Sequence, residues 1–273
     1  MVPTRRRRFA LPPHSKSWYS NAVLMTESKT IVLLHGFPFN RSMWNEQIEF
    51  LGAHGYRVLA PDLRGLGENR VRDEISTMEE MARHVATRMD ETKSARAVIC
   101  GLSMGCYVAF DFINLFPARV CALVLAGGRA EGPDKAEKQS REQQAKRVLE
   151  SGFAPSVESI LQSLLAPQTL NEKPQVVMRV REMVAKTDPA GAAAAQRGMA
   201  ARRDYRGDLT QISVPTLIIA GRDDGVRKPI DAETIHQGIQ DSRLEIIPKA
   251  GHLMNMEQPA KFNQALLTFL KSL

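Results

Sequence analysis

Short apolar runs alternate with amphipathic stretches along the first half of the chain. The runs lie near residues 31 to 34, 57 to 60, 96 to 100 and 120 to 125. Their length suits strands that are buried on both faces, and the stretches between them repeat their apolar residues at helical spacing. This alternation predicts an α/β fold with a mostly parallel, doubly wound sheet.

One predicted helix shows a start signal as well as a periodic apolar face. Ser76 and Glu79 have the spacing of a capping box, and the apolar residues that follow recur at helical spacing from Met78 to Met89. His84 falls on the polar side of this helix. We therefore expect His84 to be solvated.

The strand pattern stops at residue 128. Between residues 129 and 207 helix-forming residues dominate, and the apolar ones recur at helical spacing in Val157–Leu165 and Val176–Val184. We therefore predict a helical cap at residues 129–207. It interrupts an α/β core that is formed by residues 1–128 and 208–273.

Composition and charge narrow the class of protein. The chain has 273 residues, 43% of them apolar and 25% charged, which is ordinary for a globular protein. The net charge of +7 falls to +3 without the four arginines Arg5–Arg8, because 7 minus 4 is 3, and this short run carries no interleaved aromatic residues. We interpret it as a solvated terminus and predict no nucleic-acid partner.

The sequence also bears on location and on redox chemistry. No segment is long and apolar enough to span a membrane, and no apolar stretch follows the basic residues near the N-terminus. A cytoplasmic protein is the expectation. Three cysteines lie in or beside predicted core elements without the spacing of a disulfide framework, and we predict buried, reduced thiols.

A serine stands at the junction between a predicted strand and a predicted helix. Ala97–Cys100 form the strand, Cys106–Phe116 form the helix, and Gly101-Leu102-Ser103-Met104-Gly105 lies between them. A hydroxyl at such a turn is lifted above the sheet edge and lies at a helix N-terminus, where negative charge is favoured. The flanking glycines let strand and helix pack closely. Ser103 is therefore the predicted nucleophile.

A serine nucleophile needs a base that takes its proton and an acid that orients the base. The apolar strand Val214–Ala220 ends in a turn that carries Asp223 and Asp224, and the strand Arg243–Pro248 is followed by His252. Parallel strands bring their carboxyl ends to one edge of the sheet. We predict His252 as the base and one of the two aspartates as the acid.

A second loop at that sheet edge follows the strand near 31 to 34 and begins with His35-Gly36-Phe37-Pro38. A loop at this position supplies one donor of an oxyanion hole, and the residue after the nucleophile supplies the other. We predict the backbone N–H groups of Phe37 and Met104 as these donors. His35 then has a structural role.

With these pieces in view, the chain resembles α/β-hydrolases of the esterase and 3-oxoadipate enol-lactonase-like group from about Ile31 onward. Such enzymes share the chain order nucleophile, acid, base, and their acid usually stands three residues after a glycine, which here is Gly221 and selects Asp224. The matching segments are His35–Pro38, Pro61–Gly65, Gly101–Gly105, Val214–Asp224 and Gly251–Pro259. The resemblance implies an α/β-hydrolase fold whose cap is inserted after the sixth-strand position.

Two departures from the resemblance carry expectations of their own. Leu66–Asn69 stand where such enzymes commonly carry a glycine and serine pair, so we expect an altered rim of the site. The segment before Ile31 is a poor match to their usual opening hairpin, which indicates a reduced sheet edge.

The resemblance and the motifs together predict a serine hydrolase that cleaves small-molecule carboxylic esters through an acyl-enzyme, without a metal or an organic cofactor. A lactonase, a cofactor-free perhydrolase or a hydrolase of C–C bonds would use the same Ser103, Asp224 and His252. Outside enzymes, a small-molecule receptor on the same fold is the alternative. The cap carries only two aromatic residues, Phe153 and Tyr205, which favours a small or medium acyl group.

Overall fold

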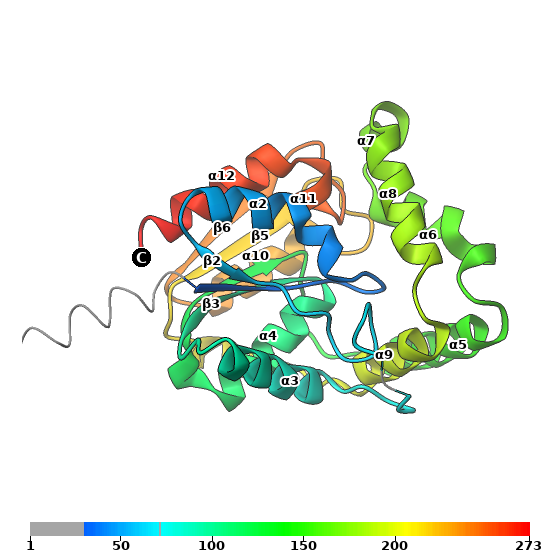
Figure 1. Cartoon of the computed structure of the whole chain (residues 1–273), viewed down its shortest axis with the longest axis horizontal. Coiled ribbons are helices and arrows are strands. Elements are labelled where there is room, and N and C mark those ends of the chain that lie inside the picture. Colours follow the sequence, from blue (N-terminus) through cyan, green and yellow to red (C-terminus); the bar gives the residue numbers. More distant parts are fainter. Residues whose placement is uncertain (1–29, 71) are drawn as a thin grey trace, which may run out of the picture.

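A computed structural model describes residues 30–70 and 72–273 of the chain and shows one six-stranded sheet (Figure 1). The strands are β1 Thr30–Leu34, β2 Arg57–Leu59, β3 Ala97–Leu102, β4 Val120–Ala126, β5 Thr216–Gly221 and β6 Ser242–Ile247. Their order is β2-β1-β3-β4-β5-β6, and every neighbouring pair is parallel. The predicted parallel sheet is confirmed. The Arg5–Arg8 run and the expected reduced sheet edge lie outside the described residues.

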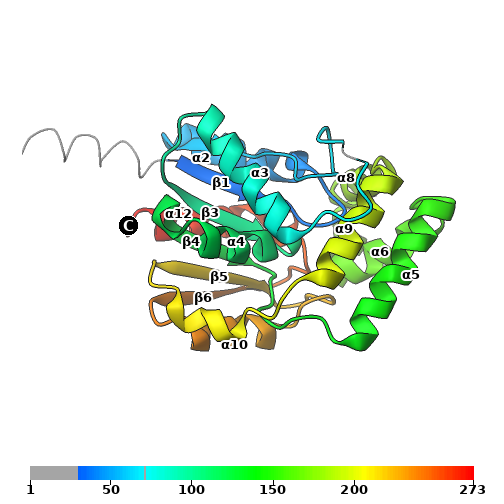
Figure 2. The ribbon, with the colours of Figure 1, turned by 90° about the horizontal axis from the view of Figure 1, so that it is seen from below.

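Helices cover both faces of the sheet, because parallel neighbours are joined by crossover connections. Figure 2 shows one face covered by α3, α4 and α10, and the opposite face carries α2, α11 and α12. The bounds are α2 Asn45–Ala53, α3 Met78–Glu91, α4 Met104–Leu115, α10 Pro229–Gly238, α11 Met254–Glu257 and α12 Pro259–Leu270.

Successive side chains of each strand point to opposite faces of the sheet, so each face of the sheet has its own apolar core. Ile31 and Leu33 point into the core that holds Trp44 and Phe262, whose ring centroids lie 5.9 Å apart. Val32 and its alternating neighbours point into the core under α3 and α4. Strands that are apolar on both faces therefore read as continuous hydrophobic runs, which is the pattern the sequence shows.

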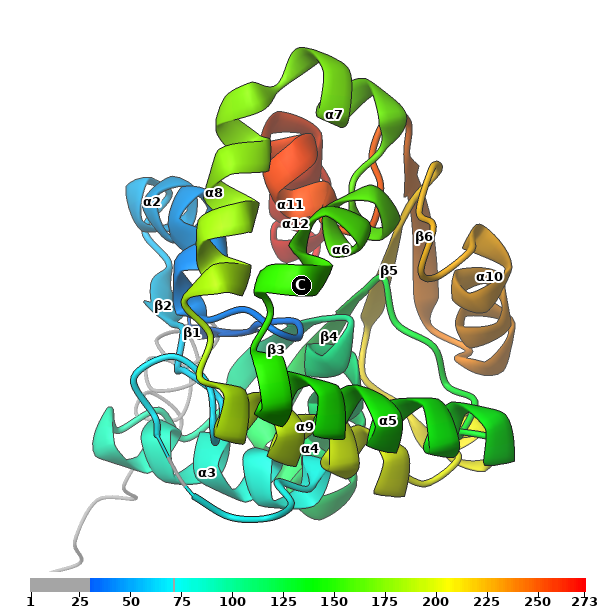
Figure 3. The ribbon, with the colours of Figure 1, turned by 90° about the vertical axis from the view of Figure 1, so that its right-hand side faces the viewer.

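Five helices follow β4 and precede β5, and they lie beyond the carboxyl ends of the strands (Figure 3). They are α5 Lys135–Ser151, α6 Val157–Leu164, α7 Pro167–Glu172, α8 Pro174–Ala185 and α9 Pro189–Ala201. Short 3-10 turns complete the described elements at η1 Arg41–Trp44, η2 Pro117–Arg119, η3 Ala154–Ser156 and η4 Arg206–Gln211. These helices occupy the stretch expected to form the cap, whose division from the core at 129–207 stays a prediction.

The start of α3 differs by one residue from the expectation. Thr77, not Ser76, is the N-cap: its hydroxyl accepts the Glu80 N–H at 3.1 Å, and the Glu80 carboxylate accepts the Thr77 N–H at 2.9 Å. Ser76 is fully buried, and its N–H donates to the carbonyl of Ala194 in α9 at 3.0 Å. The contact with the cap helices removes Ser76 from the capping position, and local spacing did not reveal it.

Candidate active site

Ser103 lies at the tip of the turn between β3 and α4, as the sequence predicted. Its φ of 55° and ψ of −111° are strained for a residue with a Cβ. The turn is so tight that neither flanking glycine could carry a Cβ. A Cβ on Gly101 would lie 2.3 Å from the Gly105 carbonyl oxygen, and one on Gly105 would lie 2.2 Å from the Leu34 carbonyl oxygen. Only glycine at both positions lets the backbone close in this way.

Asp224 and His252 meet at the carboxyl ends of β5 and β6. The His252 Nδ1 lies 2.7 Å from the Asp224 Oδ2, and both side chains are almost fully buried. The other carboxylate oxygen of Asp224 accepts the backbone N–H groups of Val226 and Arg227 at 2.7 and 2.8 Å. These bonds fix the carboxylate, and the neighbouring Asp223 is exposed.

The ring of His252 packs against the end of β4. A Cβ on Gly127, which has a φ of +56°, would lie 3.3 Å from the ring atoms Cε1 and Nδ1. The backbone at this point therefore sets one wall for the imidazole. Because Nδ1 faces Asp224, Nε2 is the nitrogen left to exchange a proton with another group.

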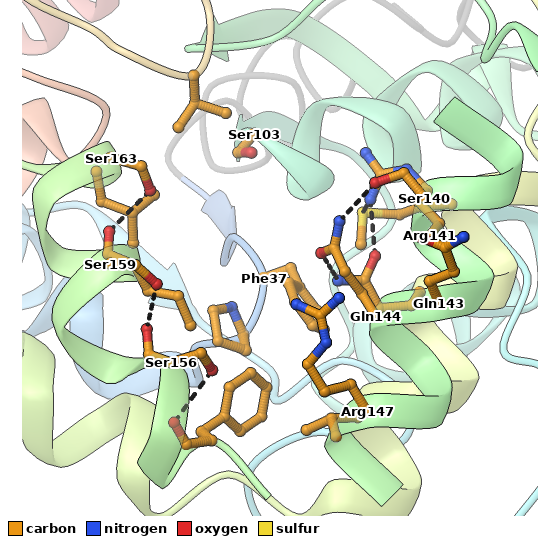
Figure 4. Close-up of a pocket in the computed structure, with 18 of the residues that line it drawn as sticks. Phe37, Ser103, Ser140, Arg141, Gln143, Gln144, Arg147, Ser156, Ser159 and Ser163 are labelled. Atoms are coloured by element: carbon orange, nitrogen blue, oxygen red, sulfur yellow. Dashed lines mark hydrogen bonds between the residues drawn. The ribbon is translucent and has the colours of Figure 1, made fainter. Parts of the chain in front are cut away.

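Ser103 and His252 line one cavity of about 770 Å³ between the sheet edge and the cap. Figure 4 shows polar side chains of α5, among them Gln144 and Arg147, across the cavity from Ser159 and Ser163 of α6. Phe37 also lines the cavity and lies 6.3 Å, between ring centroids, from Phe153 of the cap. The site is thus built from segments far apart in the sequence.

The two predicted oxyanion donors lie in segments that adjoin Ser103. Met104 is the first residue of α4, where helix geometry leaves backbone N–H groups without intrahelical acceptors. The Phe37 loop also approaches the turn, since a Cβ on Gly36 would lie 3.5 Å from the Cβ of Ser103. Both predicted donors therefore belong to segments that adjoin the Ser103 turn, and their role stays a prediction.

The His252 loop is bonded directly to the cap through Glu257, a residue whose role the sequence did not reveal. The buried Glu257 carboxylate accepts the N–H groups of Gly251 and Leu253 at 2.9 and 3.2 Å with one oxygen, and that of Ala166 at 2.8 Å with the other. Burial raises the pKa of this carboxyl, and the three N–H bonds oppose that rise. The residues on both sides of His252 are therefore held by one side chain.

The other two histidines considered in the sequence have structural contacts. His35 is fully buried, its Nε2 accepts the Leu63 N–H at 2.9 Å, and burial lowers its pKa, as expected of a structural residue. His84 is not solvated as predicted: it is half-buried, and its Nε2 lies 3.0 Å from the Asn69 side-chain nitrogen. The loop that carries Asn69 folds back onto α3, and burial lowers the pKa of His84.

The altered site rim expected from Leu66–Asn69 does not appear among the residues that line the cavity. None of Leu66–Asn69 lines the cavity, and Leu66 is fully buried in the core. The departure from the family pattern therefore lies outside the cavity lining.

Three comparisons place the chain among known proteins. The family pattern described as the α/β hydrolase fold matches residues 29–259. The chain belongs to this family. Its relatives include 3-oxoadipate enol-lactonase 1 of Acinetobacter baylyi, which is 32% identical over 243 residues that cover 89% of each chain.

Solved structures give the same result for this α/β hydrolase. A thermophilic esterase from Thermogutta terrifontis, solved with malate bound, superposes with a TM-score of 0.87 and 37% identity over 89% of each chain. The enol-lactonase from Burkholderia xenovorans gives a TM-score of 0.82 and 27% identity, covering 89% of this chain and 92% of that one. The predicted fold family and the predicted hydrolase class are confirmed, whereas the roles of individual side chains stay predictions.

A membrane-spanning helix and a metal-binding cluster are both absent from the described part of the chain. No helix within residues 30–70 and 72–273 has the length and apolar character needed to cross a bilayer. The same residues hold no group of three or more His, Cys, Asp or Glu side chains suited to a metal ion.

Proposed function

We propose that this chain hydrolyses carboxylic esters, with Ser103 as nucleophile, His252 as base and Asp224 as the acid that orients it. The observation that carries the proposal is the 2.7 Å contact between His252 Nδ1 and Asp224 Oδ2, in a cavity that Ser103 also lines. That contact directs the other ring nitrogen to proton transfer. The cytoplasmic location inferred from the sequence stays a prediction.

In the proposed reaction His252 Nε2 takes the Ser103 proton while the Ser103 oxygen attacks the ester carbonyl. The Asp224 carboxylate stabilises the imidazolium, and the N–H groups of Phe37 and Met104 stabilise the oxyanion. The imidazolium then protonates the departing alcohol, which leaves an acyl-enzyme. Water, activated by the same imidazole, attacks the acyl group and releases the acid and free Ser103.

A lactone is the second candidate substrate, because ring opening uses the same attack on an ester carbonyl. It is favoured by the enol-lactonase relatives from two organisms. Three assays separate esterase, lactonase and perhydrolase activity. They measure hydrolysis of short-chain esters, hydrolysis of lactones, and peracid formation from acetate and peroxide. Cleavage of open-chain esters faster than lactones supports the first proposal.

The nucleophile is tested with a chromogenic short-chain ester and a fluorophosphonate probe. Ser103→Ala should lower kcat by about a thousandfold or more and abolish labelling. Ser159→Ala makes the same change elsewhere in the cavity, where the hydroxyl only donates to the Ser156 carbonyl at 2.9 Å, and should retain labelling. Full turnover by Ser103→Ala overturns the proposal. Tight ligand binding by wild-type protein that neither turns over nor labels supports a receptor instead.

A further inference from the structure

The loop that carries Phe37 is fixed by hydrogen bonds on the side of the core. The Gly36 carbonyl accepts the Phe39 N–H at 3.0 Å and lies 3.0 Å from Nδ1 of His35, and the Gly36 N–H lies 3.3 Å from the sulfur of Met43. The N–H of Phe37 has no acceptor among the described residues. The turn is therefore bonded around an N–H group that is left available for a ligand.

A second set of bonds reaches the same loop from the cap. The Thr187 hydroxyl, at the end of α8, lies 2.6 Å from the Pro38 carbonyl oxygen. Arg179 of α8 donates to the Ser42 carbonyl and pairs with Glu46 at 3.0 Å. The cap therefore contacts the loop directly after the predicted oxyanion donor and again a few residues later.

The Thr187 hydroxyl has one hydrogen and two neighbouring acceptors. Its oxygen lies 2.6 Å from the Pro38 carbonyl oxygen and 2.9 Å from the Met183 carbonyl oxygen, one turn earlier in α8. The shorter distance assigns the hydrogen to Pro38. The hydroxyl is thus used between distant segments and not only within its own helix.

Thr187 is itself held from both sides, so it can position the loop. Its N–H donates to the Val184 carbonyl at 3.3 Å. The next residue, Asp188, is the N-cap of α9, and its carboxylate accepts the N–H groups of Ala190 and Gly191 at 2.8 and 3.1 Å. The junction between α8 and α9 is a fixed support for the hydroxyl.

We propose that Thr187 is a positioning residue for the oxyanion hole, acting on the Phe37 N–H through the Pro38 carbonyl. This inference rests on the proposed ester hydrolysis. Phe37 and Pro38 line the cavity and Thr187 does not, so the hydroxyl contacts the loop and not the substrate. Negative charge develops on the substrate oxygen only as Ser103 attacks. A displaced donor therefore weakens binding of the transition state and leaves binding of the ester unchanged.

The test removes the hydroxyl and keeps the shape of the side chain. Thr187→Val should lower kcat by about tenfold and keep KM within about twofold, because loss of a whole oxyanion donor costs about a hundredfold to a thousandfold and its displacement costs less. Thr187→Ser retains the hydroxyl and should restore kcat to within about twofold of wild type. Active sites are counted with the fluorophosphonate probe, so kcat refers to folded protein.

Thr234→Val is the matched control. The Thr234 hydroxyl donates to the Ile230 carbonyl at 2.9 Å, which is the same contact within a helix that Thr187 has with Met183. Thr234 is exposed on α10 and does not line the cavity, so this change should leave kcat and KM unchanged. Should Thr187→Val fail to fold, Thr187→Ala removes the same hydroxyl with less bulk and should give the same loss of kcat.

Phenylboronic acid provides a readout that does not depend on turnover. Its boron accepts an electron pair from the Ser103 oxygen while the hydroxyl proton passes to His252, and the resulting tetrahedral boronate places a negative oxygen at the oxyanion hole. Thr187→Val should weaken binding of this compound by about tenfold, in step with the fall in kcat. A side chain that only stabilises the fold would not link these two quantities.

The two proposals fail in different ways. An unchanged kcat in Thr187→Val, a rise in KM alone, or no recovery in Thr187→Ser overturns the positioning role while ester hydrolysis stands. If wild-type protein cleaves no ester, ester hydrolysis is wrong, and calorimetry of boronate binding still decides the role of Thr187. Tighter binding to wild type than to Thr187→Val supports it, whereas equal binding, or binding to neither, overturns it.

Discussion

The contacts of Glu257 predict that its replacement by glutamine loosens the His252 loop. In Glu257→Gln one carboxylate oxygen becomes an NH₂ group, which cannot accept a hydrogen bond. If the remaining oxygen keeps Gly251 and Leu253, the NH₂ group faces the Ala166 N–H, whose bond to the carboxylate measures 2.8 Å. A hydrogen bond to a charged group contributes about 1.5–3 kcal/mol.

We expect a loss of about 2 kcal/mol in the free energy of unfolding, since relief of the buried charge offsets part of the cost. For a chain of 273 residues that lowers Tm by about 3–4 °C. The kcat should also fall by about tenfold, because a displaced imidazole is poorly aligned with the attacked carbonyl.

The assay combines thermal unfolding with kcat measured well below Tm on the chromogenic ester. Fluorophosphonate titration of active sites normalises kcat to folded protein, so a purely structural loss leaves the normalised value unchanged. Glu172→Gln on α7 is the control: the residue is exposed, and its effect should stay within about 0.5 kcal/mol. An unchanged Tm and an unchanged normalised kcat in Glu257→Gln refute the reasoning.

Three further predictions follow from contacts at the site and the turn. Asp224→Asn should lower kcat by about a hundredfold or more, because the imidazole of His252 loses its charged partner. Asp223→Asn, at an exposed position, should retain most of the activity, and steady-state kinetics of the two variants measure the difference. Burial acts to raise the pKa of Glu137, but the bonds and charges of Arg202 and Arg141 outweigh burial and lower the pKa to about 2. Glu137 should therefore stabilise the fold above pH 4.5 by on the order of 2 kcal/mol, and that contribution should vanish as pH falls from 4.5 toward 2. Chemical unfolding of wild type and Glu137→Gln across that range measures the difference, which a pH-independent gap would contradict. Gly105→Ala should cost about 3 kcal/mol, since its Cβ would lie 2.2 Å from the Leu34 carbonyl oxygen; a midpoint equal to wild type would disprove the clash.

Much of the fold follows from local sequence signals. The strand before Ser103 and the helix after it were predictable because an apolar run, two glycines and a periodic helix lie within twenty residues. The pairing of Asp224 with His252 was predictable in outline, because parallel strands deliver their carboxyl ends to one edge.

The features that local sequence signals did not predict depend on contacts between segments far apart in the chain. Ser76 loses the capping position to Thr77 because its backbone bonds to α9, and His84 is half-buried because the loop with Asn69 folds over it. Arg141 and Arg227 come from segments more than eighty residues apart and meet at the cavity only through the orientation of the cap helices. Helical periodicity does not determine that orientation.

The bond from the His252 N–H to the Leu164 carbonyl, at 2.7 Å, constrains how the specificity of this hydrolase can be engineered. Grafting a foreign segment in place of residues 129–207 would remove the acceptor that holds the histidine backbone, together with the Ala166 N–H that anchors Glu257. Chimeras should therefore retain the junction between α6 and α7. Side chains of α5 and α6 that face the cavity can be exchanged without breaking either anchor.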